Sequence, residues 1–83
     1  MKRIITAVDI QRRPSGFGHI GIRAIAHIEV GGIRQKVMSA GLCGIEDDSS
    51  ESYLNEVEDK EKAQLRIMLY ELGFSKRAVA QAF

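Results

Sequence analysis

The densest charge in the sequence lies between residues 46 and 59, where seven acidic side chains occur without a basic one. Carboxylates this close together can bind a divalent cation through oxygen ligands or attract a basic partner. A calcium-binding loop is not predicted, because glycine and glutamate do not fall at the required spacing. The same residues suit a helix start, which is the more common use of such a segment. The partner-binding candidates here are Glu46, Asp47, Asp48, Glu51, Tyr53 and Glu56.

A second set of candidates is basic and lies in the first half of the sequence. Its members are Arg12, Arg13, Arg23, Arg34 and Lys36. Basic side chains on paired strands can contact nucleic-acid phosphates. Scattered solvent-facing charge is the competing interpretation, because only one aromatic residue, Phe17, is close enough to interleave with them. Convergence of the five on one face would favour nucleic-acid binding.

No residue pattern predicts catalysis, a cofactor or a metal ion. Cys43 is the single cysteine, and a lone cysteine is most often a small buried apolar group. His19 and His27 lie about 27 Å apart along a strand, too far for one metal ion. The segment GFGHIG has the glycine spacing of a dinucleotide-binding loop, but it opens a predicted strand rather than a helix. The protein is therefore predicted not to be an enzyme.

Composition predicts one small domain over residues 1–83, since 45% of the 83 residues are hydrophobic and 28% are charged. A single cysteine excludes an intramolecular disulfide and fits a reducing, cytoplasmic setting. The initial apolar stretch, broken by Thr6 and Asp9, is too short for a signal or membrane span, so no membrane partner is expected. Residues 1–45 carry seven bases and two acids, a net +5, whereas residues 46–83 carry five bases and nine acids, a net −4.

The beginning of the chain predicts a strand followed by a loop. Residues 2–10 are rich in Ile, Val and Thr, and their alternation would place Ile4, Val8 and Ile10 on one face. Residues 11–18, QRRPSGFG, contain a proline and two glycines and predict a loop.

The clearest strand runs from His19 to Val30, where apolar residues recur at every second position. Gly31-Gly32 supplies the backbone angles of a two-residue hairpin turn. Such a turn sets Glu29 opposite Arg34 and apolar pairs on the other face. The face that carries this charge pair also displays Arg23, Ile25, His27, Lys36 and Met38. It is apolar enough that we expect a second subunit or the C-terminal tail to cover part of it.

The second half predicts a close turn and a long helix. GLCGI contains two glycines and predicts the turn, and Ser49 or Ser50 can cap the helix. Apolar residues follow helical spacing from Glu51 to Leu72, except that Glu61 occupies an expected apolar position, so a bend or break is predicted around residues 58–62. Gly73 suits the helix end, and Ser75 can cap a last short helix to Phe83.

Together these elements predict an α+β fold. About three antiparallel strands, whose order stays open, would form a sheet that packs against the long C-terminal helix, followed by the short terminal helix. The helix residues expected on the sheet are Leu54, Val57, Leu65, Met68 and Leu72.

Residues 39–74 read SAGLCGIEDDSSESYLNEVEDKEKAQLRIMLYELGF. This string resembles a pattern of uncharacterised small proteins from bacteria and their phages or plasmids: S-x-G-L-x-G-I-E-x-D-S, then Y-L, E-V-E and a leucine-rich helix ending in G-F. Cys43 stands where that pattern has an aromatic residue. The resemblance implies a bacterial or mobile-element setting and no particular activity.

Three functional hypotheses follow. The first is a small non-catalytic protein-binding module, an accessory or inhibitory factor of a phage or mobile element, acting through the acidic helix start or the spare sheet face. The second is a nucleic-acid-binding protein that uses the basic loop and hairpin. The third is a structural homo-oligomer, suggested by Ile25 and Met38 on the spare face. Split charge and the absence of a catalytic pattern favour the first.

Overall fold

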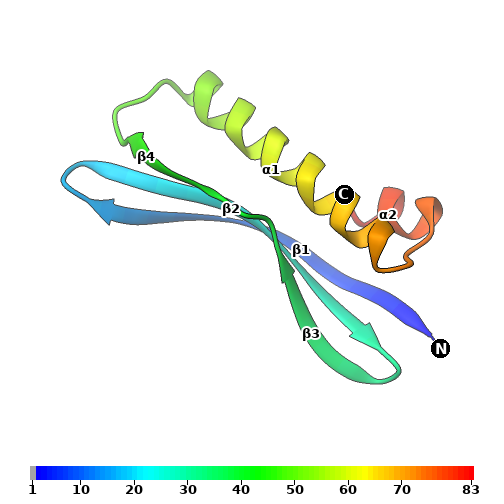
Figure 1. Ribbon diagram of the computed structural model, residues 1–83. Coiled ribbons are helices and arrows are strands. Elements are labelled where there is room, and N and C mark those ends of the chain that lie inside the picture. The colour runs from blue at the N-terminus through cyan, green and yellow to red at the C-terminus, as the bar shows by residue number, and fades with distance from the viewer. Residues whose placement is uncertain (1) are drawn as a thin grey trace.

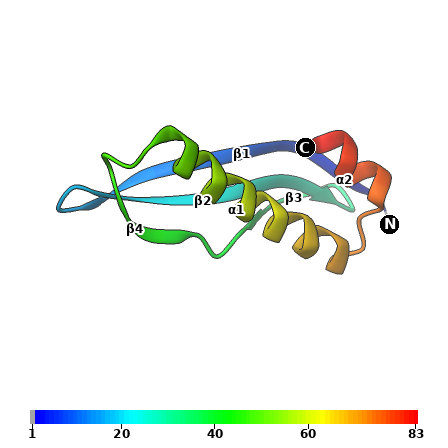
Figure 2. The same cartoon turned by 90° about the horizontal axis from the view of Figure 1, so that it is seen from above.

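The computed structural model describes residues 2–83, and it confirms the predicted α+β class. An open antiparallel sheet carries both helices on one face, as Figure 1 shows from the side and Figure 2 from above. In chain order, the elements are β1 (Arg3–Gly16), β2 (His19–Val30), β3 (Ile33–Met38), β4 (Leu42–Glu46), α1 (Glu51–Glu71) and α2 (Lys76–Ala82).

Strand β2 is the centre of the sheet. It pairs with β1 on one side, and on the other side it pairs with β3 through residues 25–30 and with β4 through residues 19–22. Because β3 and β4 follow one another along the same edge of β2, the four strands make a sheet only three strands wide.

The β2–β3 hairpin confirms the predicted turn and register. Gly31 and Gly32 adopt φ angles of 60° and 82°, which a two-residue turn of this hand requires. Val30 lies opposite Ile33 and Glu29 opposite Arg34, as predicted.

Two predicted irregular segments are strands instead. Residues 11–16 extend β1, so the predicted loop over 11–18 shrinks to a tight turn at Gly16, Phe17 and Gly18. Pro14 is tolerated because β1 is an edge strand, whose outward N–H groups need no partner in the sheet. Most of the GLCGI segment belongs to β4, Leu42–Glu46, since its backbone pairs with the beginning of β2.

A bulge in β1 changes which residues face the helices. The register shifts between Ile5 and Ala7, so Thr6 is an extra residue in the strand. Ile5 therefore packs on the core together with Val8 and Ile10, whereas Ile4 turns away and is 36% exposed. The prediction was right for Val8 and Ile10 and wrong for Ile4, because simple alternation does not anticipate a bulge.

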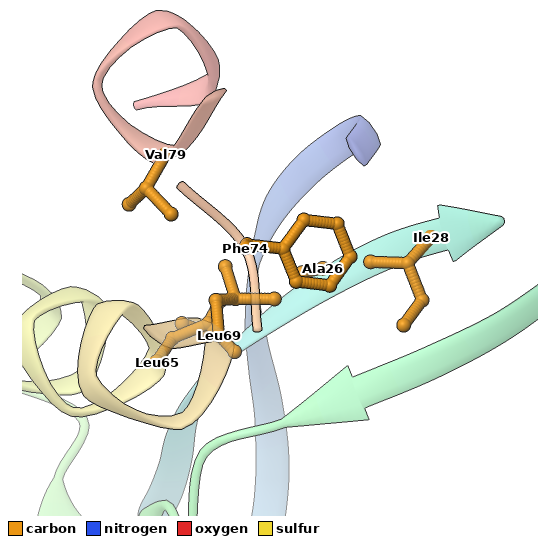
Figure 3. Packing of buried hydrophobic residues seen from close by; sticks show 7 residues of the cluster. Ala26, Ile28, Leu65, Leu69, Phe74 and Val79 are labelled. Carbon is orange, nitrogen blue, oxygen red and sulfur yellow. The ribbon is translucent and has the colours of Figure 1, made fainter. Parts of the chain in front are cut away.

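Two groups of buried side chains hold α1 and α2 on the sheet. The larger, drawn in Figure 3, joins β2 to both helices through Ala24, Ala26, Ile28, Leu65, Leu69, Phe74 and Val79. The smaller consists of Ile22, Ile45, Leu54 and Val57, near the start of α1. Leu72, predicted to pack here, is 48% exposed, because α1 ends at Glu71 and Phe74 takes the buried place after the turn.

Helix α1 runs without a break through residues 58–62, so the predicted interruption is absent. Glu61 faces the gap between β3 and β4, where its Oε1 atom accepts hydrogen bonds from the Ser39 hydroxyl and the Gly41 N–H, both at 2.7 Å. The buried Ser39 Oγ also accepts a bond from the Ala24 N–H at 2.9 Å. A polar residue is needed here because the interrupted strand presents polar groups to the helix.

Candidate functional site

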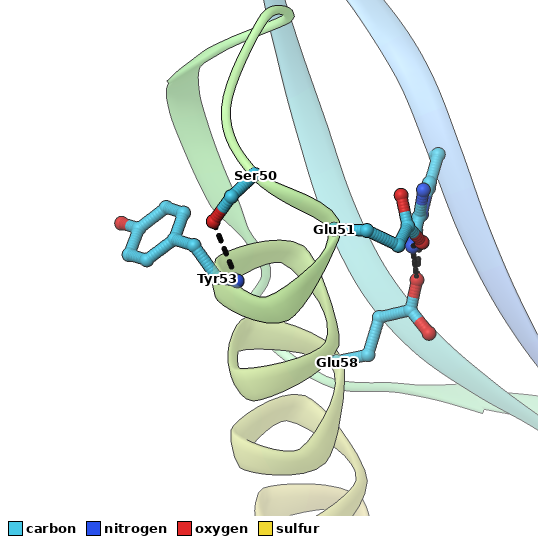
Figure 4. Close-up of polar contacts among 5 residues, drawn as sticks. Ser50, Glu51, Tyr53 and Glu58 are labelled. Atoms are coloured by element: carbon cyan, nitrogen blue, oxygen red, sulfur yellow. Dashed lines mark hydrogen bonds and ion pairs between the residues drawn. The ribbon is translucent and has the colours of Figure 1, made fainter.

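The acidic helix start is partly used inside the fold. Ser50 caps α1 by accepting a hydrogen bond from the Tyr53 N–H at 3.2 Å (Figure 4). Arg12 of β1 donates through Nε to Glu58 at 2.6 Å and through a terminal nitrogen to Glu51 at 2.8 Å. These bonds lower the pKa of the Glu51 carboxyl and raise the pKa of Arg12, since they favour both charged forms. Arg12 and Glu51 thus join β1 to the helix.

The other acidic candidates lie on the surface but do not form one cluster. Glu46 ends β4, and Asp47 and Asp48 occupy the turn before α1, all three exposed. Tyr53 and Glu56 are exposed on α1. Within residues 2–83, no group of three or more His, Cys, Asp or Glu side chains is placed to hold a metal ion.

The sheet face opposite the helices is bare in residues 2–83, as Figure 1 shows. We term it the outer face. The predicted cover by the C-terminal tail is wrong, because Val79 of α2 packs into the core on the helix side. Strand alternation and register assign to the outer face Ile4, Ala7, Asp9, Gln11, Arg13, Gly21, Arg23, Ile25, His27, Glu29, Arg34, Lys36 and Met38.

Four of the five predicted basic residues share the outer face: Arg13, Arg23, Arg34 and Lys36. Arg12 lies on the opposite face because successive strand residues alternate. Two acids are interspersed, and both are paired: Asp9 lies 3.1 Å from His27, and Glu29 lies 3.4 Å from Arg34. Within residues 2–83, Arg13, Arg23 and Lys36 form no ion pair, so the outer face carries excess positive charge.

The centre of the outer face is apolar. Ile25 and Met38 lie opposite each other in the β2–β3 register, and Met38 is 44% exposed. Toward the β2–β3 hairpin, the face is hollowed into a shallow groove of about 850 Å³, whose lining includes Ala7, Asp9 and Lys36. The outer face therefore combines an apolar centre with charged surroundings.

The other end of the outer face holds a smaller pocket of about 160 Å³. We term it the arginine pocket; its lining includes Arg13, Gly21, Arg23, Gly41 and Cys43. Cys43 is exposed, so the expectation of a buried apolar thiol is wrong. The reason is that β4 places Cys43 beside Gly21, where no side chain covers it.

Phe17 at the tip of the β1–β2 hairpin is a candidate that the sequence reasoning did not select. Its side chain is fully exposed, and its φ of 52° is in the left-handed region that glycine favours. Exposed aromatic side chains are frequent anchors in protein interfaces. Sequence reasoning named Phe17 only as the aromatic residue near the basic candidates, because it assigned residues 11–18 to a loop and did not expect the tip of a hairpin.

Comparison with protein-family models, curated proteins and solved structures finds no match for the chain. Among residues 2–83, neither helix has the length and apolar composition needed to span a membrane.

Proposed function

We propose that this protein is a small non-catalytic protein-binding module that binds its partner through the outer face and the exposed Phe17. The carrying observation is that the sheet buries one face under both helices and leaves the other open, with Ile25 and Met38 at its centre. A sheet face with apolar residues usually packs against another layer, so a partner would provide that layer.

The outer face supports this role better than the acidic helix start does. Glu51 and Glu58 already bind Arg12, whereas Arg13, Arg23 and Lys36 have no ion-pair partner within residues 2–83. We infer that the partner surface is acidic. Following the resemblance of residues 39–74, we further propose an accessory or inhibitory role in a phage or mobile element.

A second copy of the chain fits the outer face less well than an acidic partner. Face-to-face pairing of two copies would bring together surfaces that each carry Arg13, Arg23, Arg34 and Lys36. Like charges that meet in an interface are unfavourable. We therefore expect the homo-oligomer, which was one of the initial hypotheses, to be disfavoured at low salt.

The test is capture of partners from a bacterial lysate by immobilised protein, with bound proteins quantified by mass spectrometry. The double variant Arg34→Glu/Lys36→Glu reverses charge on the outer face, and Phe17→Asn removes the aromatic tip. The control Lys76→Glu/Arg77→Glu makes the same charge change on exposed residues of α2. We expect at least one protein to bind the parent and the control but neither other variant. Equal retention by all four proteins, or no retention, would contradict the proposal.

Nucleic-acid binding is the second candidate, favoured by the convergence of four basic residues on the outer face. The apolar centre of this face, at Ile25 and Met38, weakens the case, because contacts to nucleic-acid phosphates are made by basic and polar side chains. A mobility-shift assay at low salt tests this candidate. A shift that disappears in Arg34→Glu/Lys36→Glu would support it, and no shift would exclude it.

A further inference from the structure

The arginine pocket has the features of a small anion site. It lies at the end of the outer face nearest Phe17, and it is lined by side chains and backbone of β1, β2 and β4. Its volume of about 160 Å³ suits one side-chain group rather than a large ligand. Arg13 and Arg23 both contribute to its lining, which makes the pocket positively charged.

The two arginines of the pocket are not used in internal ion pairs. Within residues 2–83, no carboxylate lies within ion-pair distance of either, and the recorded polar contact of Arg23 is to the Met38 sulfur at 3.7 Å. The neighbouring Arg12, by contrast, binds two carboxylates. Arg13 and Arg23 thus keep their hydrogen-bonding capacity available for a ligand.

Gly21 keeps the pocket open, although the backbone conformation at this position does not require a glycine. Its φ is outside the left-handed region, so a side chain would cause no backbone strain. An added Cβ would come no closer than 3.6 Å to the Cys43 sulfur and the Leu42 carbonyl oxygen, which is an ordinary contact. A glycine inside a strand weakens the strand and often marks close approach of another molecule. Here it leaves free the space that a ligand would fill.

We propose that the arginine pocket receives a carboxylate side chain from the protein partner. This rests on the proposed function and specifies the partner chemistry that the outer face recognises. A planar carboxylate accepts paired hydrogen bonds from a guanidinium, and two arginines can hold one acidic side chain in a defined place. The partner would then insert an Asp or Glu at this end of the interface, with its apolar contact at Ile25 and Met38.

The experiment titrates the full ¹⁵N-labelled chain with a capped peptide of three glutamates and follows backbone amide shifts. A four-nucleotide thymidine strand with three phosphates carries the same charge and serves as the parallel probe. We expect saturable shifts at Gly21, Arg23 and Gly41 with the peptide. We expect affinity to fall roughly threefold or more in Gly21→Ala and saturation to disappear in Arg13→Gln/Arg23→Gln. The control Arg77→Gln, on α2, should behave as the parent.

Gly21→Ala separates binding from folding, because the added methyl group fits and should leave the melting temperature equal or higher. Peptide affinity unchanged in Gly21→Ala would overturn the proposal, as would saturable binding of the thymidine strand alone, which would indicate a phosphate site. If the peptide does not bind but lysate capture still depends on Arg34 and Lys36, the pocket is wrong and the protein-binding function stands.

Discussion

Arg12 and Arg13 are adjacent in the sequence but lie on opposite faces of the sheet. Arg12 faces α1 and binds Glu51 and Glu58, whereas Arg13 lies on the outer face and lines the arginine pocket. The cause is strand alternation, which puts neighbouring side chains on opposite faces of a sheet. Sequence reasoning grouped the two arginines because it assigned residues 11–18 to a loop. Arg12 therefore has a structural role, whereas Arg13 is a candidate binding residue.

Replacement of Arg12 should make stability less dependent on pH. The pKa of Glu51 is lowered in the folded protein from an ordinary value of 4.5, so its pairing stabilises the fold above that pH and is lost as pH falls through the lowered value. The same hydrogen bonds raise the pKa of Arg12, so Arg12 stays charged at every pH concerned. We expect Arg12→Gln to lower the melting temperature at pH 7, with a smaller difference from the parent at pH 3. Circular-dichroism melts measure both.

The control for this prediction is Arg13→Gln, which removes the same charge from the neighbouring position but breaks no internal ion pair. It should leave the melting temperature close to that of the parent at both pH values. A deficit of Arg12→Gln that stays constant down to pH 3 would contradict the role assigned to Glu51.

Phe17 is expected to destabilise the folded protein relative to a residue that tolerates its backbone conformation. Its left-handed φ of 52° is unfavourable for an aromatic residue and better tolerated by asparagine. We expect Phe17→Asn to raise the free energy of unfolding by about 1 kcal/mol, measured by urea denaturation. Phe17→Ala also removes the ring but keeps a residue that strains at this φ, so it should gain less. Equal gains in the two variants would show that the exposed ring, not the backbone, is responsible.

At the scale of elements, Glu61 interrupts the apolar stripe of α1. The reason is that α1 contacts the break between β3 and β4 at this position. Glu61 binds Ser39 and Gly41, and the Gln64 side chain accepts a bond from the Ala40 N–H at 2.7 Å. The helix therefore supplies hydrogen bonds to residues that, at this interruption, are not paired in the sheet as strand residues are. The chain therefore stops pairing with β2 after Met38 and resumes pairing at Leu42, and these polar groups of residues 39–41 still have hydrogen-bond partners.

Glu61→Leu tests this contact, because it completes the apolar stripe while removing the acceptor. If polar pairing matters more than apolar burial, the variant should lose about 1–3 kcal/mol of unfolding free energy. Glu61→Gln keeps a side-chain oxygen at the same position and should lose less. Urea denaturation measures both changes, and stabilisation by leucine would show that the polar contact is dispensable.

At the scale of the whole molecule, the fold is elongated. Its extents are 45 × 21 × 17 Å, and its radius of gyration is 14.0 Å, against about 12 Å for a compact chain of this length. The sheet is only three strands wide, and the β1–β2 hairpin projects beyond the start of α1 (Figures 1 and 2). A small core therefore supports a large exposed sheet face, and each buried side chain contributes a large share of the stability.

Leu69→Ala should be severely destabilising, since Leu69 is fully buried between α1 and the sheet. Loss of its side chain is expected to cost about 2–5 kcal/mol, comparable with the total stability of a small domain. Leu72→Ala is the matched control, because Leu72 is exposed and should change stability by less than about 0.5 kcal/mol. Thermal melts of the two variants give the comparison. Similar losses in both would contradict the assignment of the core.

The sequence by itself determined the local features of this protein: the alternation of β2, the glycine turn after Val30, a serine cap at Ser49 or Ser50, and a helix that ends before Gly73. These depend on neighbours in the chain, whose conformational preferences are visible in the residue types. The sequence also identified the acidic and the basic candidate residues, but it did not show which of them lie together in space.

Only the tertiary structure decided which of those residues come together. The bulge at Thr6, the pairing of β4 with β2 and the extension of β1 to Gly16 all depend on hydrogen bonds to a distant strand. They moved Ile4 out of the core, exposed Cys43, directed Arg12 to α1 and placed Arg13 beside Arg23. The outer face and its arginine pocket exist because strand pairing aligns side chains far apart in the sequence, which no local pattern records.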